Sequence, residues 1–196
     1  MNPFDVGYYT EDELAHFGFK RLGKNISIAK SCNIIGLENI SLGDNVRIDG
    51  YTTIVASGKG FLNLGSFIHI GGYAFLSAGA GITMNDFSGI SQGVKIYSKT
   101  DDYSGNFLTN PTVDPDFTQV TSGEVVLGRH AIIGSGTVIL PRVTVGEGAS
   151  VGALSLVTKS LPDWGVYFGA PAKKIKDRKK KLLELEREFL EQFSKG

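Results

Sequence analysis

The chain has 196 residues, including 26 glycines and one cysteine, and its 20 basic and 20 acidic residues give a formal net charge of zero at pH 7. This length fits one ordinary domain, the lone Cys32 excludes an internal disulfide framework, and no apolar run approaches the ~18 residues of a membrane span. The N-terminus shows no secretory signal, so we expect a cytoplasmic protein. Glycine is roughly twice as frequent as the ~7% of average proteins, and a folded repeat has to account for it.

The first expected element is a short helix over residues 10–19, within an N-terminal cap spanning residues 1–21. Thr10 followed by Glu13 three residues later is the capping-box pattern that begins a helix. We expect this helix to cover the first coil of the repeat that follows, because the open end of a stack of strands exposes unpaired backbone groups.

A six-residue repeat runs through residues 22–162. Its aliphatic positions are Leu22, Ile28, Ile34, Leu42, Ile48, Ile54, Leu64, Ile70, Leu76, Met84, Ile90, Ile96, Leu127, Ile133, Ile139, Val145, Val151 and Val157. Six residues turn an α-helix by about 600°, which would scatter these side chains, and the glycines that often follow them would break a plain strand. The pattern predicts an all-β parallel solenoid of about six coils, in which each hexad forms one side of a prism.

Two segments leave the repeat. Residues 97–126 form one long excursion, and loops of ~30 residues inside compact domains are usually functional. Residues 163–196 are predicted to be a loop followed by an amphipathic helix over residues 173–193, with Leu182, Leu185, Phe189 and Phe193 along one face. We expect this apolar stripe to pack on the prism or on another subunit.

The basic residues are unevenly placed, since seven of the nine residues from Lys173 to Lys181 are Lys or Arg. A solvated helix face and a patch for a phosphorylated ligand both explain this run. The rest of the chain carries 13 basic and 19 acidic residues, which is not the broad basic surface of a nucleic-acid-binding domain.

The hexads, together with the stretch VTKSLPDWGVYFGAPAKKI after the last coil, resemble the hexapeptide-repeat acyltransferases over roughly residues 20–180. The resemblance implies a left-handed parallel β-helix, a homotrimer, and acyl-CoA bound in clefts between subunits. It implies pantetheine contacts near Gly134, Ser135, Gly152 and Ala153. It places the adenine and phosphates near Thr158, Lys159, Pro171, Lys173 and Lys174.

In sugar O-acetyltransferases of this family, a catalytic histidine follows an Ile-Tyr-x-x-Thr stretch. Here Ile96 to Thr100 matches that stretch, but the next residue is Asp101. With an ordinary pKa of ~3.9, an aspartate side chain is a weak base for a sugar hydroxyl, whereas a neutral amine is already nucleophilic and needs only orientation and removal of a proton. The replacement therefore favours an amino-sugar acceptor.

The run from Ser98 to Gly105 is similar to that of N-acyltransferases acting on nucleotide-linked 4-amino-4,6-dideoxy sugars. This resemblance implies that Asp101 and Ser91 lie at the reaction centre. It implies an acceptor site that includes Tyr97, Lys99, Asp102 and Asn110. The implied role is synthesis of surface polysaccharide, such as lipopolysaccharide.

Other interpretations remain open. Asp101 can simply cap a turn, and Ser91 can be an ordinary outward residue of the solenoid. His69 is the alternative catalytic base, which defines a rival function as a sugar O-acetyltransferase, and a catalytically silent trimeric scaffold is a second rival. His130 is expected to point outward. Three dispersed histidines and one cysteine make no convincing zinc site, so we expect no metal.

Overall fold

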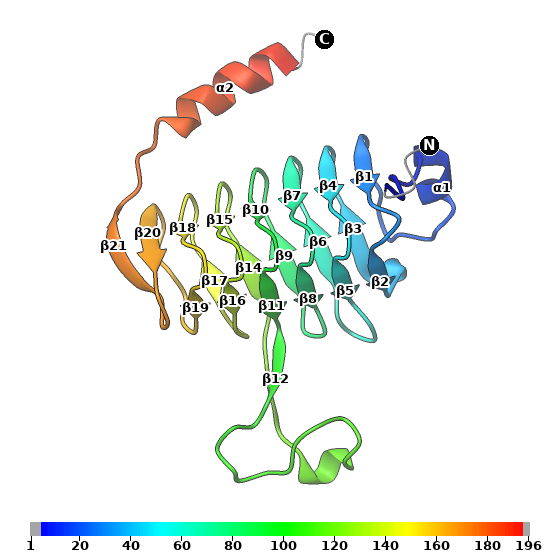
Figure 1. Ribbon diagram of the computed structural model, residues 1–196, viewed down its shortest axis with the longest axis vertical. Helices are drawn as coiled ribbons and strands as arrows, with labels where there is room; N and C mark the ends of the chain where they lie inside the picture. The colour runs from blue at the N-terminus through cyan, green and yellow to red at the C-terminus, as the bar shows by residue number, and fades with distance from the viewer. Residues whose placement is uncertain (1–4, 194–196) are drawn as a thin grey trace.

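The computed structural model describes residues 5–193 and shows a three-sided parallel β-solenoid (Figure 1). Face 1 contains β1 (Ile26–Ile28), β4 (Val46–Ile48), β7 (Ile68–Ile70), β10 (Gly89–Ile90), β15 (Ile132–Ile133), β18 (Ser150–Val151) and β20 (Gly165–Phe168). Face 2 contains β2 (Asn33–Ile35), β5 (Thr53–Val55), β8 (Phe75–Ser77), β11 (Lys95–Tyr97), β16 (Val138–Ile139) and β19 (Leu156–Val157). Face 3 contains β3 (Ile40–Leu42), β6 (Leu62–Leu64), β9 (Ile82–Met84), β14 (Val125–Leu127) and β17 (Thr144–Val145).

The core is the column of hexad aliphatics that the repeat predicts. On face 1, Ile48, Ile70 and Ile90 are direct partners in neighbouring strands, and Ile133 and Val151 continue the column. All five are buried. Full burial of one such side chain contributes about 1.5–3 kcal/mol, so the stacked columns hold the coils together.

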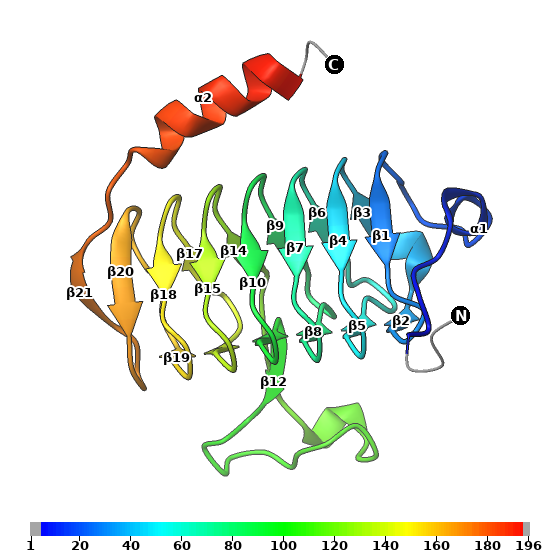
Figure 2. The same ribbon diagram turned by 45° about the horizontal axis from the view of Figure 1, so that its top comes forward.

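The coil is left-handed, as the resemblance implies. The chain runs along face 1, crosses to face 2 and returns on face 3 while it advances toward the C-terminal end (Figure 1 and Figure 2). Face 1 has seven parallel strands, so the solenoid has about seven coils rather than the expected six. The additional coil closes through β20, which lies beyond the last hexad at Val157.

Close stacking of the coils explains many of the glycines. A Cβ on Gly134 would collide with the backbone of Ala153, and one on Gly152 would collide with the ring of Phe168. Other corners use bulky residues at positive φ, such as Phe67 and Phe87, whose rings stack with centroids 4.6 Å apart. The corner residues therefore form a ladder along the outside of the prism.

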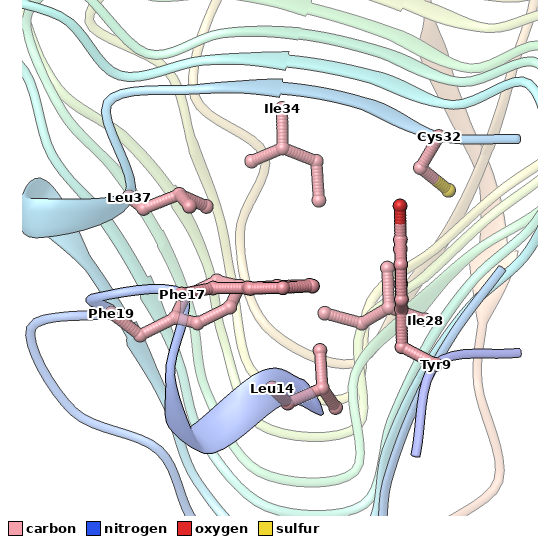
Figure 3. Close-up of a pocket in the computed structure, with 8 residues that line it drawn as sticks. All are labelled: Tyr9, Leu14, Phe17, Phe19, Ile28, Cys32, Ile34 and Leu37. Atoms are coloured by element: carbon pink, nitrogen blue, oxygen red, sulfur yellow. The ribbon is translucent and has the colours of Figure 1, made fainter. Parts of the chain in front are cut away.

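The N-terminal cap contains a helix that is shorter than expected, α1 (Glu11–Ala15). The capping box is present: the Thr10 amide donates to Glu13 Oε2 over 2.7 Å, and the Glu13 amide donates to Thr10 Oγ1 over 3.2 Å. Leu14 is buried, and with Phe17 and Phe19 it faces Ile28 across a cavity of about 130 Å³ (Figure 3). The cap thus covers the first coil. A single turn of 3₁₀-helix, η1 (Leu37–Asn39), adjoins this end.

The excursion forms an arm rather than an irregular loop. Its stem is an antiparallel pair, β12 (Lys99–Asp101) and β13 (Val120–Ser122), and its tip contains the 3₁₀ turn η2 (Pro115–Phe117). The arm projects from the prism on the side opposite the C-terminal helix (Figure 1). Its root therefore extends the face 2 strand β11 away from the solenoid.

The expected helix over residues 173–193 is wrong for its first part. Residues Lys173–Asp177 form β21, which pairs antiparallel with β20, and the helix α2 spans Leu182–Phe193. The last strand of a solenoid offers unpaired backbone groups, and β21 satisfies them on one edge. Within residues 5–193, no helix is long and apolar enough to cross a membrane.

Helix α2 packs back on the corner ladder of face 1. The Phe189 and Phe193 rings lie 5.3 and 5.4 Å from the ring of Phe67. Glu186 pairs with Arg129 and lies 2.9 Å from Nε2 of His130. His130 is directed outward from the coil, toward Glu186 of α2, and α2 covers it so that only 8% of it is exposed.

Candidate active site

Two clefts contain the predicted catalytic residues. The sheet cleft, of about 290 Å³, lies on face 1 and is lined by Phe67, His69, Phe87, Ser88, Gly89, Ile90, Ser91, His130, Ala131, Ile132, Arg178 and Leu182. The arm cleft, of about 470 Å³, lies at the root of the arm and is lined by Ser77, Tyr97, Lys99, Thr100, Asp101, Tyr103, Pro111 and Val120. In one chain, Asp101 therefore does not share a cleft with Ser91 and His69.

Asp101 ends the stem strand β12, where its backbone pairs with Val120. It is half-buried, and no side chain or amide within residues 5–193 hydrogen-bonds its carboxylate. A turn-capping aspartate would accept local amide bonds, and Asp101 does not. Its carboxylate is thus available to a molecule that enters the arm cleft.

The neighbouring Asp102 behaves differently. Its Oδ2 accepts hydrogen bonds from the hydroxyl and amide of Ser104 and from the amide of Gly105. These bonds, with the Ser104 hydroxyl foremost, lower the pKa of the Asp102 carboxyl below its ordinary value. Asp102 therefore holds the turn that begins the arm's loop.

Of the other predicted acceptor contacts, two line the arm cleft and one does not. Tyr97 and Lys99 line the arm cleft, and the Tyr97 ring lies 5.6 Å from that of Phe75. Asn110 is exposed at positive φ, and its Oδ1 accepts bonds from the amide and hydroxyl of Thr112. The structure brings Tyr97 and Lys99 to Asp101 and uses Asn110 to shape the loop.

Ser91 directly follows β10 and is half-buried. Its amide donates to the carbonyl of Ile133, which fixes the backbone, while its hydroxyl has no partner within residues 5–193. Gly71 and Gly134 take the matching place after the hexad aliphatic in the coils on either side. The Ser91 hydroxyl thus lies at a position that is glycine in the coils on either side.

His69 projects from the middle of β7 and is held by a carboxylate. Its Nε2 lies 2.8 Å from Oδ2 of Asp49, whose Oδ1 accepts from Nε of Arg47 over 2.6 Å. Burial alone raises the pKa of the Asp49 carboxyl, but hydrogen bonds from His69 and Arg47 outweigh it and the pKa falls below its ordinary value. An imidazole oriented by an ionised carboxylate has the arrangement of a general base.

Sequence reasoning missed Asp49. A signal was available, because Asp49 follows the hexad residue Ile48 at a position where other coils carry glycine, as at Gly71 and Gly134. It also missed Gly89, which pairs with His69 on one side and with Ile132 on the other and leaves a gap between their side chains. The sequence gives no signal for this gap, because Gly89 is one of 26 glycines.

The residues expected to contact coenzyme A lie along the later coils. Gly134, Ser135, Gly152 and Ala153 follow β15 and β18 in successive coils, and the two glycines are required by close stacking alone. The backbone of Leu156 bonds with that of Gly169 and of Ala172. These bonds place Leu156, two residues before Thr158, beside the turn from Gly169 to Ala172 that contains Pro171, and Lys173 and Lys174 follow in the strand paired with β20.

The basic run is only partly free for an anion. Nη1 of Arg178 donates to the carbonyls of His130 and Gly148, and burial lowers the pKa of its guanidinium. Lys174 pairs with Asp177 over 2.6 Å. Lys173 is exposed and has no ion pair within the described chain. Among residues 5–193, no group of three or more His, Cys, Asp and Glu is placed to hold a metal ion.

The chain is similar to several known acyltransferases. The family model of the bacterial transferase hexapeptide (six repeats) matches residues 124–159. The dTDP-4-amino-4,6-dideoxy-D-glucose acyltransferase of Escherichia coli is 41% identical over 184 residues, which cover 94% of this chain and 95% of the relative. WbbJ of Escherichia coli strain K12, named for O-acetyl transfer in lipopolysaccharide biosynthesis, is 29% identical over 71% of this chain and 69% of its own length.

Solved structures extend the comparison. AntD, an N-acyltransferase from Bacillus cereus in complex with dTDP and 3-hydroxybutyryl-CoA, matches with 42% identity and a TM-score of 0.92 over 96% of this chain and 98% of that chain. AntD variants changed at a serine, or at an aspartate ten residues later, match with TM-scores of 0.90 to 0.91. The chain belongs to the hexapeptide-repeat acyltransferases.

A hexapeptide-repeat acyltransferase needs a group that takes up the proton of the attacking nucleophile and donors that stabilise the oxyanion. In this acyltransferase, the Asp101 carboxylate and the Ser91 hydroxyl have no hydrogen-bond partner among residues 5–193. Their chemistry suits the two tasks, and their separation into two clefts is the feature of the site that a function has to explain.

Proposed function

We propose that this acyltransferase transfers an acyl group from acyl-CoA to the amine of a nucleotide-linked amino-deoxy sugar. The observation that carries the proposal is the aspartate at the position of the family's catalytic histidine. Asp101 lies ten residues after Ser91, which is the spacing of the serine and aspartate replaced in the AntD variants. Variants of AntD changed at that serine have been solved with dTDP-4-amino-4,6-dideoxyglucose and coenzyme A.

The proposed reaction is direct. The neutral sugar amine attacks the thioester carbonyl, a C–N bond forms, and the C–S bond then breaks. Asp101 accepts the proton that the nitrogen loses, and this proton passes to the departing sulfur, so CoA leaves as the thiol. The Ser91 hydroxyl donates to the oxyanion, together with backbone amides of the solenoid.

Acyl-CoA is a co-substrate in this proposal. We infer that the pantetheine arm follows the later coils near Gly134 and Gly152, and that the phosphates lie by Lys173 at the C-terminal end. Lys173 is exposed and free of ion pairs within residues 5–193, so its charge is available to a phosphate. The pairing of Lys174 with Asp177 makes Lys174 the weaker of the two candidates.

We further propose that the working enzyme is a cytoplasmic homotrimer, with each active site between two copies. The separation of Ser91 and Asp101 supports this assembly, because a cleft between copies can take the serine from one and the aspartate from the next. A role in surface polysaccharide synthesis follows from the substrate class.

The test is an assay with acetyl-CoA and a panel of nucleotide-linked sugars, in which release of the free thiol is measured. Turnover with dTDP-4-amino-4,6-dideoxyglucose and none with the corresponding 4-hydroxy sugar supports the proposal. If the enzyme acylates hydroxyl sugars and no amino sugar, the proposal is contradicted.

A second candidate, sugar O-acetyl transfer, is favoured by the contact between His69 and Asp49. A sugar hydroxyl needs a base that works near neutral pH, and an imidazole held by a carboxylate is such a base. In the same assay, turnover of hydroxyl sugars that disappears in a His69→Gln variant would establish this function.

A further inference from the structure

The outward positions of face 1 form a row that runs along the solenoid. From β4 to β18 the row contains Arg47, His69, Gly89, Ile132 and Ser150, each paired directly with the next. His69 and Ile132 are exposed. Gly89 lies between them, and the gap that it leaves forms the middle of the sheet cleft.

Neither the backbone nor the packing requires glycine at position 89. Its φ lies outside the left-handed region, and a Cβ there would meet only the carbonyl oxygen of His69 at 3.4 Å, an ordinary contact. Gly71, one coil earlier, is different, because its Cβ would lie 2.7 Å from the amide nitrogen of Gln92. The missing side chain at Gly89 therefore leaves space that the fold itself does not need.

This space leads from Ser91 toward the C-terminal helix. Ser91 is two residues after Gly89, at the end of the same strand, and both line the sheet cleft. The walls farther in are the rings of Phe67 and Phe87, and Leu182 at the start of α2 adds an apolar side chain.

Two of the polar side chains at that end of the cleft, His130 and Arg178, already have partners. Nε2 of His130 lies 2.9 Å from Glu186 Oε2. Nη1 of Arg178 donates to two backbone carbonyls. The Ser88 hydroxyl also lines the cleft and is buried without a hydrogen-bond partner within residues 5–193. The cleft thus combines apolar walls with a few polar groups, and the Ser91 hydroxyl lies at its start.

We propose that the sheet cleft binds the acyl chain of the donor, and that Gly89 makes room for chains longer than acetyl. This inference rests on the proposed function, in which Ser91 contacts the thioester carbonyl. A chain that continues from this carbonyl meets the gap at Gly89 and then the apolar walls. The rings of Phe67 and Phe87 and the Leu182 side chain suit an acyl chain better than a sugar, because burying sugar hydroxyls against apolar walls without partners costs binding free energy.

The first measurement compares wild-type kcat/KM for acetyl-, propionyl- and butyryl-CoA with one amino-sugar acceptor. Each methylene buried in an apolar site favours binding by roughly fourfold. We therefore expect butyryl-CoA to exceed acetyl-CoA by roughly tenfold or more. Equal or falling values along the series overturn the inference.

Substitutions that add a side chain at Gly89 test whether this residue sets the preferred length of the acyl chain. A Gly89→Val variant should lose most of its butyryl transfer and keep acetyl transfer within about threefold, and Gly89→Ala should lie between it and the wild type. Ser150→Val is the matched control, since Ser150 occupies the same row but does not line the cleft. An Ile132→Ala variant, which widens the cleft, should shift the preference to longer chains, and it decides the question if Gly89→Val does not fold.

Two further outcomes separate the hypotheses. If Gly89→Val raises the KM of the amino sugar by the same factor with every acyl-CoA, the cleft holds the acceptor and the inference is wrong. If the wild type transfers no acyl group to any amino sugar, the proposed function fails. Calorimetric binding of butyryl-CoA and of CoA to the wild type and to Gly89→Val then still tests the acyl site, and equal affinities in all four titrations overturn it.

Discussion

The sheet cleft and the arm cleft are built in different ways. The floor of the sheet cleft consists of coils joined by continuous parallel pairing, so Ser91 and His69 have positions set by the repeat. The arm cleft is bounded by a hairpin outside the repeat, and this hairpin carries Asp101. In the proposed function the two parts have different tasks: the solenoid provides the hydroxyl of Ser91, and the insertion provides the carboxylate of Asp101.

The largest effect should come from the arm. Asp101→Asn keeps the shape of the side chain but removes the proton acceptor, so kcat should fall by about 10²-fold or more, within the usual range for loss of a general base. The measurement is steady-state thiol release with saturating amino sugar and acyl-CoA.

The matched control for this variant is Asp102→Asn, because Asp102 is the adjacent carboxylate and is bonded to the loop through Ser104 and Gly105. It should reduce kcat by less than about tenfold, since loss of a turn-holding bond moves the arm without removing the base. Equal losses in the two variants would show that the position of the arm, and not the Asp101 carboxylate, limits the rate.

The division between the clefts can be tested by mixing two variants. Ser91→Ala should also be slow, because loss of one oxyanion donor lowers kcat by about 10²-fold. Chains of Ser91→Ala and Asp101→Asn that are unfolded, mixed in equal amounts and refolded together should recover about a quarter of wild-type activity, since a quarter of random neighbouring pairs combine one intact serine with one intact aspartate.

Recovery depends on a site shared between copies. If Ser91 and Asp101 of the same chain meet in one site, every chain in the mixture lacks one of them and the activity stays at the level of the separate variants. Sedimentation of the mixture, compared with that of the wild type, controls for loss of assembly.

Much of the solenoid is predictable from the sequence because each coil repeats one requirement. Aliphatics such as Ile70 and Ile133 must stack, so the six-residue period remains visible even though each strand has only two or three residues. Asp101 is recognisable because it breaks a family pattern at a position with a known chemical task.

Other features have no local cause in the sequence. Residues Lys173–Asp177 are mostly charged, which suits an exposed helix, and they form a strand because the edge of β20 needs a partner. His130 is buried because α2 returns over the corner of face 1, a contact between residues 56 positions apart. Both depend on where the chain meets itself, which the period does not encode.

Arg178, which lines the sheet cleft next to α2, allows a test of stability. Arg178→Ala removes the donor that His130 and Gly148 carbonyls share, and hydrogen bonds to a charged group contribute about 1.5–3 kcal/mol. The free energy of unfolding in urea should fall by about that amount, with faster amide exchange in α2. Lys179→Ala, an exposed change one residue away, should change it by less than about 0.5 kcal/mol. Equal effects would mean that Arg178 does not anchor this segment.

The smallest effect on kcat is expected from replacing His69. His69 is held by Asp49 in a form suited to a general base, yet an amine acceptor does not need one of that strength. His69→Gln should therefore change kcat for the amino sugar by less than about threefold, and the wild type and variant should share the same pH profile between pH 6 and 8. If the His69 imidazole is the base, the variant should instead lose kcat by about 10²-fold and its pH profile should differ from that of the wild type. That result would move the role of base from the arm cleft to the sheet cleft.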